Sequence, residues 1–175
     1  QPIRDDGPQS HIIKKQGTPT MGGFMILLAL SVSTLLWADL SNRYVWAVLL
    51  VTAGFGLIGF ADDYLKVTRA NVRGLPGRLK LLLEVIVAAL AALWIMDYQP
   101  DNMASHLAVP FIKDVLFDLG IFFIPFATLV MVGSSNSVNL TDGLDGLAIG
   151  PLIIAASAFM LIAYLTGNVV FAGYL

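Results

Sequence analysis

The chain has 175 residues, of which 57% are hydrophobic, 13% are charged and none is cysteine, and its net charge is −2. Ordinary soluble domains carry about 25% charged residues, so this composition argues against a soluble enzyme, a disordered tail and a basic nucleic-acid binder. The absence of cysteine excludes disulfides, thiolate metal sites and cysteine nucleophiles.

The first twenty residues are polar and match neither a signal peptide nor a transit peptide. We interpret residues 1–175 as an interior piece of a longer membrane protein, a single membrane-embedded catalytic domain that is incomplete at both ends. A membrane-crossing helix needs about 20 mostly apolar residues. Five windows qualify: Met21–Ala38, Tyr44–Ala61, Leu79–Met96, Ile121–Val138 and Leu147–Leu165. The sequence therefore predicts an all-α, polytopic transmembrane helix bundle.

The segments between and within these windows carry three further predictions. Asp39–Arg43 is short enough only for a tight turn between antiparallel helices. Segment 97–120 has apolar residues at helical spacing, Leu116 and Leu119 among them, and is expected to form an amphipathic segment on the outer interface. Pro125 falls inside the fourth window and predicts a kink.

The distribution of Lys and Arg predicts the orientation. Eight of the ten lie on the side that holds the N-terminus, and only Arg43 and Lys113 lie on the other. Because cytoplasmic loops are enriched in positive charge, the N-terminus is predicted to be cytoplasmic.

Three patterns are explained without a functional site. Residues 54–59 spell GxGxxG inside an uninterrupted apolar window, which favours close helix packing over a dinucleotide site. The glycosylation sequon at Asn139 falls on the predicted cytoplasmic side. Glu84 is an intramembrane acid, but pairing with Lys80 or snorkelling to the interface explains it equally well.

The chemistry-bearing residues gather at the predicted cytoplasmic helix ends, in three clusters. The first is KQGTPTMGG at 15–23, where Lys15, the hydroxyl of Thr18 and backbone N–H groups at a helix start suit a phosphate. A helix cap built from Thr20 and Pro19 explains the same residues.

The second cluster is the adjacent pair Asp62 and Asp63 at the inner end of the second window. Carboxylates at a helix C-terminus oppose the helix dipole, so local stability gives no reason for the pair, which suits a divalent cation or acid–base work. The alternative is a solvated pair neutralised by Lys66 and Arg69.

The third cluster places oxygen-bearing side chains every three residues, at Asn136, Asn139, Asp142 and Asp145. Three-residue spacing lines one edge of a 3₁₀ or irregular segment, and Gly143 with Gly146 favours that geometry over a continuous α-helix. Asn and Asp oxygens are ligands that Mg²⁺ prefers. The three clusters together indicate Mg²⁺-dependent phosphate chemistry at the cytoplasmic surface.

Four motifs carry a family resemblance: GPQSH at 7–11, KxGTPTMGG at 15–23, DDYLK at 62–66 and NxVNLTDGLDGLA at 136–148. Their order and spacing resemble the polyprenyl-phosphate N-acetylhexosamine-1-phosphate transferases, and within them the phospho-N-acetylmuramoyl-pentapeptide transferases. The resemblance covers the whole chain and implies a protein of ten membrane helices, of which this chain would hold the second to the sixth. His11 and Lys15 are one residue further apart than in the family pattern, so no role is assigned to His11.

The resemblance implies an activity, a cofactor and partners. Phospho-MurNAc-pentapeptide would pass from UDP-MurNAc-pentapeptide to undecaprenyl phosphate, giving lipid I and UMP for peptidoglycan synthesis. The enzyme would require Mg²⁺, lie in the bacterial inner membrane with its active site facing the cytoplasm, and bind no nucleic acid; a homodimer stays open. The alternatives are a related transferase for another amino sugar, or a transporter subunit. The transporter is disfavoured because the polar clusters lie at one face and no repeat is visible.

The resemblance also implies residue roles. These are catalysis by Asp62, Asp63 and Asp142, substrate binding by Lys15, Thr18, Asn136, Gly143 and Asp145, and metal binding by Asn139. Direct attack by the lipid phosphate and a two-step route through a phosphorylated Asp142 are both open, and direct attack is favoured. Two family motifs, an acidic Mg²⁺-binding segment and a histidine cluster, would lie beyond Leu175, so residues 1–175 alone are expected to be inactive.

Overall fold

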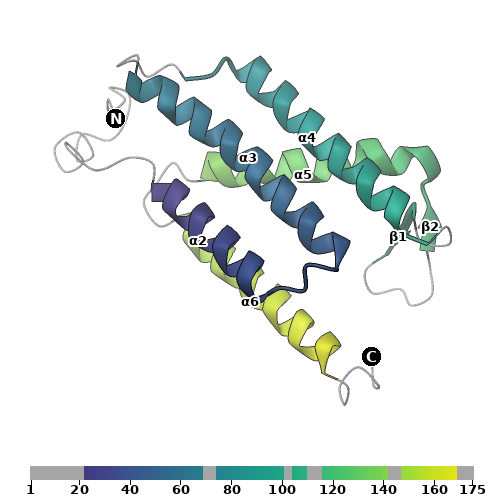
Figure 1. Ribbon diagram of the computed structural model, residues 1–175. Helices are drawn as coiled ribbons and strands as arrows, with labels where there is room; N and C mark the ends of the chain where they lie inside the picture. Colours follow the sequence, from purple (N-terminus) through teal and green to yellow (C-terminus); the bar gives the residue numbers. More distant parts are fainter. Residues whose placement is uncertain (1–21, 69–73, 101–103, 110–115, 142–146, 169–175) are drawn as a thin grey trace. The chain divides into compact units, whose positions relative to one another are not determined.

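The computed structural model describes residues 22–68, 74–100, 104–109, 116–141 and 147–168. Its elements, shown in Figure 1, are helices α2 (Gly22–Trp37), α3 (Arg43–Thr68) and α4 (Gly77–Tyr98), strands β1 (His106–Ala108) and β2 (Leu116–Asp118), a 3₁₀ turn η1 (Gly120–Phe122), and helices α5 (Phe123–Thr141) and α6 (Ile149–Gly167). Four of the helical segments are long and apolar enough to cross a membrane, and α2 is a shorter apolar helix. The predicted all-α, polytopic membrane fold is confirmed, with a small β-hairpin added.

The chain divides into two compact units, Gln1–Val132 and Gly133–Leu175, and the boundary falls inside α5. In the second unit, α6 has no buried residue. Its apolar side chains are exposed, and Ile154 and Phe159 are each 73% exposed. Single exposed apolar residues are ordinary on protein surfaces, but exposing the apolar side chains of a whole helix to water is unfavourable. This surface suits hydrocarbon or another protein segment.

In the first unit, α3 packs against both α2 and α4, and two glycines set how closely (Figure 1). A Cβ added at Gly54 would lie 2.7 Å from Cγ1 of Val87 on α4, and one at Gly56 would lie 2.5 Å from Cδ1 of Leu27 on α2. Gly59 has nothing within 4 Å of such an atom. The packing interpretation of GxGxxG is therefore confirmed, because two of its glycines admit neighbouring helices.

The buried face of α4 consists of small residues and one acid. Ala88, Ala91 and Ala92 are nearly inaccessible, and Glu84, one turn earlier, is 3% exposed. Residues three and four apart share a helix face, so Glu84 belongs to the packed face. The snorkelling interpretation of Glu84 is wrong, since a snorkelling carboxylate would reach water.

The turn between α2 and α3 is as short as expected and is closed by its own side chains. The backbone N–H of Ser41 and its hydroxyl both donate to Oδ1 of Asp39, at 2.9 and 2.6 Å. The N–H of Tyr44 donates to Oδ1 of Asn42 at 2.9 Å, which caps the start of α3. At this same end, the guanidinium of Arg43 lies 4.9 Å from the ring centre of Tyr98 on α4, so α3 and α4 run antiparallel.

The described parts of segment 97–120 after α4 contain two short strands rather than the expected amphipathic segment at helical spacing, and residues 101–103 and 110–115 lie outside the described residues. Strands β1 and β2 pair antiparallel, with His106 opposite Asp118 and Ala108 opposite Leu116. Four apolar residues at helical spacing are a weak helix signal, and Pro110 disfavours a helix interior. Asp118 accepts hydrogen bonds from the Ser105 hydroxyl and from the backbone N–H of Gly120, and these bonds close the hairpin.

The predicted kink at Pro125 is also wrong. Helix α5 begins at Phe123, so Pro125 lies in its first turn. The backbone N–H groups of a first helical turn have no intrahelical acceptor, so a proline in that turn removes no intrahelical hydrogen bond. The 3₁₀ turn Gly120–Phe122 leads into the helix, with Gly120 at φ +50.

Candidate functional site

The acidic pair lies on α3, almost two turns before the helix ends. The prediction placed Asp62 and Asp63 at the helix end, but α3 continues to Thr68. Lys66 is in its last turn, where a cation is favourable next to the helix dipole. The argument that these acids oppose the dipole is therefore wrong, because both acids precede the last turn, where the effect of the dipole is concentrated, and that turn holds Lys66.

Lys66 pairs with both carboxylates and offsets one of their two negative charges. Its Nζ lies 2.5 Å from Oδ2 of Asp62 and 3.1 Å from Oδ1 of Asp63. The two acids differ in exposure, since the side chain of Asp62 is 16% exposed and that of Asp63 is 43% exposed. The Lys66 part of the alternative interpretation is thus present, whereas Arg69, which that interpretation also requires, lies outside the described residues. One sheltered, ion-paired carboxylate stands beside one that is open to a ligand.

The loop before α4 makes the second contact with the pair. The backbone N–H of Leu75 donates to Oδ1 of Asp62 at 2.7 Å. Both oxygens of Asp62 are therefore engaged, Oδ1 by a backbone donor and Oδ2 by an ammonium group. The sequence interpretation missed this loop, although Gly74-Leu75-Pro76-Gly77 carries the glycine and proline spacing of a turn.

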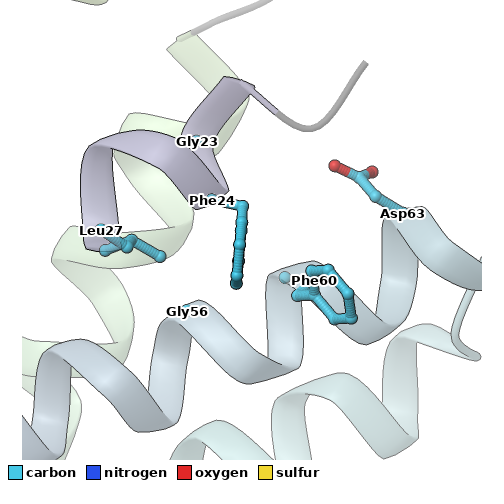
Figure 2. Close-up of a pocket in the computed structure, with 7 residues that line it drawn as sticks. Gly23, Phe24, Leu27, Gly56, Phe60 and Asp63 are labelled. Carbon is cyan, nitrogen blue, oxygen red and sulfur yellow. The ribbon is translucent and has the colours of Figure 1, made fainter. Parts of the chain in front are cut away.

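The start of α2 comes to the same end of the first unit. A cavity of about 220 Å³ is lined by Gly23, Phe24, Leu27, Gly56, Gly59, Phe60 and Asp63. Figure 2 shows Asp63 at one end of this pocket, with Leu27 and Gly56 at the other. The rings of Phe24 and Phe60 are 5.5 Å apart. The structure thus brings the last glycine of the first cluster to the second cluster, through an apolar pocket with one carboxylate.

The remaining predicted site residues are only partly described. Asn136 and Asn139 lie on α5, where Asn139 is exposed and Asn136 is half-buried. The first half of the third cluster is therefore α-helical, not 3₁₀ or irregular, and Gly143 with Gly146 lies outside the described residues. Lys15, Thr18, Asp142, Gly143 and Asp145 lie outside the described residues.

The residues fit Mg²⁺ by donor type. Among the described residues, no group of three or more His, Cys, Asp or Glu side chains is placed to hold a metal ion. Mg²⁺ is commonly bound by one or two protein oxygens, with substrate phosphates and water completing its shell. Taken separately, the exposed amide of Asn139 in the second unit and the half-exposed carboxylate of Asp63 in the first unit are donors of that kind.

Comparison with known proteins gives two findings. The model of a family described as glycosyl transferase family 4 matches residues 45–175. A phospho-N-acetylmuramoyl-pentapeptide-transferase from Granulibacter bethesdensis is 61% identical over 175 residues, which are 100% of this chain and 48% of that protein. The chain thus spans about half the length of the curated relative. Because the family model covers the acidic pair, α4, α5 and α6, the chain belongs to glycosyl transferase family 4.

Proposed function

We propose that the protein containing this chain transfers phospho-MurNAc-pentapeptide from UDP-MurNAc-pentapeptide to undecaprenyl phosphate, releasing UMP. The observation that carries the proposal is the 61% identity, over 100% of this chain, to a transferase named for that group. The four motifs that resemble this branch of the family support it residue by residue. A transporter subunit has no comparable support, since the matching family is a glycosyl transferase family.

The reaction belongs at the cytoplasmic face of a bacterial inner membrane. Four long apolar helices support a multi-pass membrane protein. The excess of Lys and Arg beside Asp62 and Asp63 supports the cytoplasmic placement of that end. A lipid acceptor can reach such a site from the bilayer while the nucleotide donor arrives from water.

The transfer breaks one phosphorus–oxygen bond and forms another. An oxygen of undecaprenyl phosphate attacks the sugar-bound phosphorus of the donor, and the electron pair of the broken bond leaves on UMP. Both substrates are anions, so their repulsion has to be offset before they meet. Lys15 offsets charge on the nucleotide phosphates, and Asp62 takes the proton of the acceptor phosphate if that phosphate arrives protonated.

Asn139 and an acid from beyond Leu175 would hold the metal. When bound, Mg²⁺ supplies Lewis-acid stabilisation of the charge on the diphosphate oxygens. Asn136, Thr18, Gly143 and Asp145 bind the donor, and Asp63 stands next to Asp62 at the apolar pocket.

A turnover assay tests the function. Full-length protein in lipid nanodiscs, given UDP-MurNAc-pentapeptide, polyprenyl phosphate and Mg²⁺, is expected to release UMP in step with lipid product. Replacing the donor with UDP-N-acetylglucosamine is the control for a related transferase. Release of UMP from UDP-N-acetylglucosamine but not from UDP-MurNAc-pentapeptide would reject the proposed substrate.

A trapping experiment separates direct attack from the two-step route. Donor labelled in its sugar-bound phosphate is incubated with the protein without lipid acceptor. We expect no labelled protein, because direct attack needs no phosphorylated aspartate. Label on the wild type that is lost in Asp142→Asn would establish the two-step route instead.

A further inference from the structure

Gly74 lies so close to Asp62 that a side chain added at this position would displace the carboxylate. A Cβ built on Gly74 would overlap Oδ1 of Asp62, and it would lie 2.7 Å from Cγ of Asp62 and 2.8 Å from Cε of Lys66. Real Cβ atoms essentially never approach other atoms this closely. Because these atoms belong to an ion-paired side chain, a larger residue at 74 has to push the Asp62–Lys66 pair away.

The same close approach delivers the hydrogen bond from the next residue. Leu75 donates its N–H to Oδ1 of Asp62 at 2.7 Å, which is a short, charge-assisted bond. Lys66 holds Oδ2 at 2.5 Å. A carboxylate fixed at both oxygens keeps one orientation, whereas Asp63 is bound at Oδ1 by Lys66 and is more exposed.

We propose that Gly74 and the backbone N–H of Leu75 form a positioning element for Asp62, which rests on the proposed function of Asp62 toward the acceptor phosphate. Neither residue touches substrate in this account. They act by holding the Asp62 carboxylate at the angle and depth from which it meets the lipid phosphate. A misplacement of about 1 Å at a reacting group can cost about 100-fold in rate.

The chain supplies a control glycine nearby. Gly77, three residues later, is the first residue of α4 and has nothing within 4 Å of an added Cβ. Gly74→Ala and Gly77→Ala therefore introduce the same methyl group, and they reduce the flexibility of the unfolded loop alike. Only the first displaces Asp62.

The kinetic test compares these two variants in the full-length protein. We expect Gly74→Ala to lower kcat about 10- to 100-fold relative to Gly77→Ala, with the KM for UDP-MurNAc-pentapeptide changed less than about twofold. Leu75→Pro, which removes the donor, should resemble Gly74→Ala, whereas Leu75→Ala, which keeps it, should not. Equal kcat values for the two glycine variants, or a loss seen mainly in KM, would overturn the proposal.

A second measurement needs no turnover and no substituted glycine. Hydrogen exchange of the Leu75 amide is compared in wild type, Asp62→Ala and Asp63→Ala. We expect about tenfold faster exchange in Asp62→Ala, corresponding to loss of a bond to a charged group, and little change in Asp63→Ala. Unchanged exchange in Asp62→Ala would refute the positioning element even if the enzyme is active. Slow exchange with an inactive wild type would instead reject the proposed function and leave the contact established.

Discussion

Asp62 and Asp118 lie at opposite ends of the antiparallel pair α3 and α4 and hold similar hydrogen bonds. Each accepts a backbone N–H, from Leu75 at 2.7 Å and from Gly120 at 2.8 Å. Asp118 is exposed, and its other partner, the Ser105 hydroxyl, also belongs to the hairpin. Asp62 is sheltered, carries a lysine and has a second acid beside it at the apolar pocket. The same kind of bond therefore closes a hairpin at one end and, at the other, fixes the carboxylate to which we assign a role in the proposed reaction.

The largest expected difference between the two aspartates is in turnover. Asp62→Asn keeps the side-chain shape but removes the charge and the proton acceptor, so we expect UMP release to fall by about 100-fold or more. Asp118→Asn, the matched change at the hairpin, should leave turnover within about twofold. Comparable activity in both variants would remove Asp62 from the proposed site.

The next difference concerns charge. Lys66→Met leaves Asp62 and Asp63 adjacent without their shared cation, and Asp62 is largely sheltered. We expect the free energy of unfolding in detergent to fall by about 1–3 kcal/mol, because removing one partner exposes the desolvation cost of the other.

A double-mutant cycle checks that assignment. Asp62→Asn combined with Lys66→Met should lose less stability than the sum of the two single changes. Strict additivity would mean that the ion pair contributes nothing to folding.

A smaller effect is expected at the hairpin. Ser105→Ala removes the hydroxyl that donates to Asp118, and the pairing of His106 with Asp118 lies directly beside it. We expect amide exchange across residues 104–109 and 116–119 to quicken about two- to fivefold, with turnover unchanged. A change in turnover would mean that the hairpin and the acidic pair are coupled. Unchanged amide exchange would mean that the Ser105 hydroxyl does not stabilise the hairpin.

The smallest effect is a dependence on pH confined to acid. The Ser105 hydroxyl, the Gly120 N–H and the nearby His106 hold the pKa of Asp118 below its ordinary value of 3.8. Because the folded pKa is the lower one, the stabilisation is fully present above about pH 5 and is lost as the pH falls through the folded pKa. Exchange protection factors for the hairpin should stay constant from about pH 5 to 8 and fall below about pH 4. A fall between pH 5 and 7 would assign the titration to another group.

The helices were predictable because their signal is local. Each window of apolar residues predicts a membrane-spanning helix by itself. The observed bounds of α2, α4 and α6 lie within two residues of the predicted ones. The hairpin and the first turn of α5 were not predictable in this way. Their outcome depends on which hydrogen bonds Asp118 accepts and on where α5 begins relative to Pro125.

The candidate site was predictable in its residue types but not in its contacts. Adjacent aspartates followed by a lysine are visible in the sequence, and so is the alternative that the lysine neutralises them. In the structure Lys66 pairs with both acids, and Asp63 still borders a pocket. Pairing with the lysine therefore does not close the candidate site.

The sequence by itself determined that this is a helical membrane protein and which motifs carry its family resemblance, since hydrophobic length and short motifs are properties of the chain alone. Only the tertiary structure decided that Leu75, 13 residues from Asp62, reaches its carboxylate. That contact requires α4 to return antiparallel along α3 at a separation admitted by Gly54, and a loop glycine that leaves room for the carboxylate. Packing geometry of this kind is set by the shapes of both partners, so no single stretch of sequence encodes it.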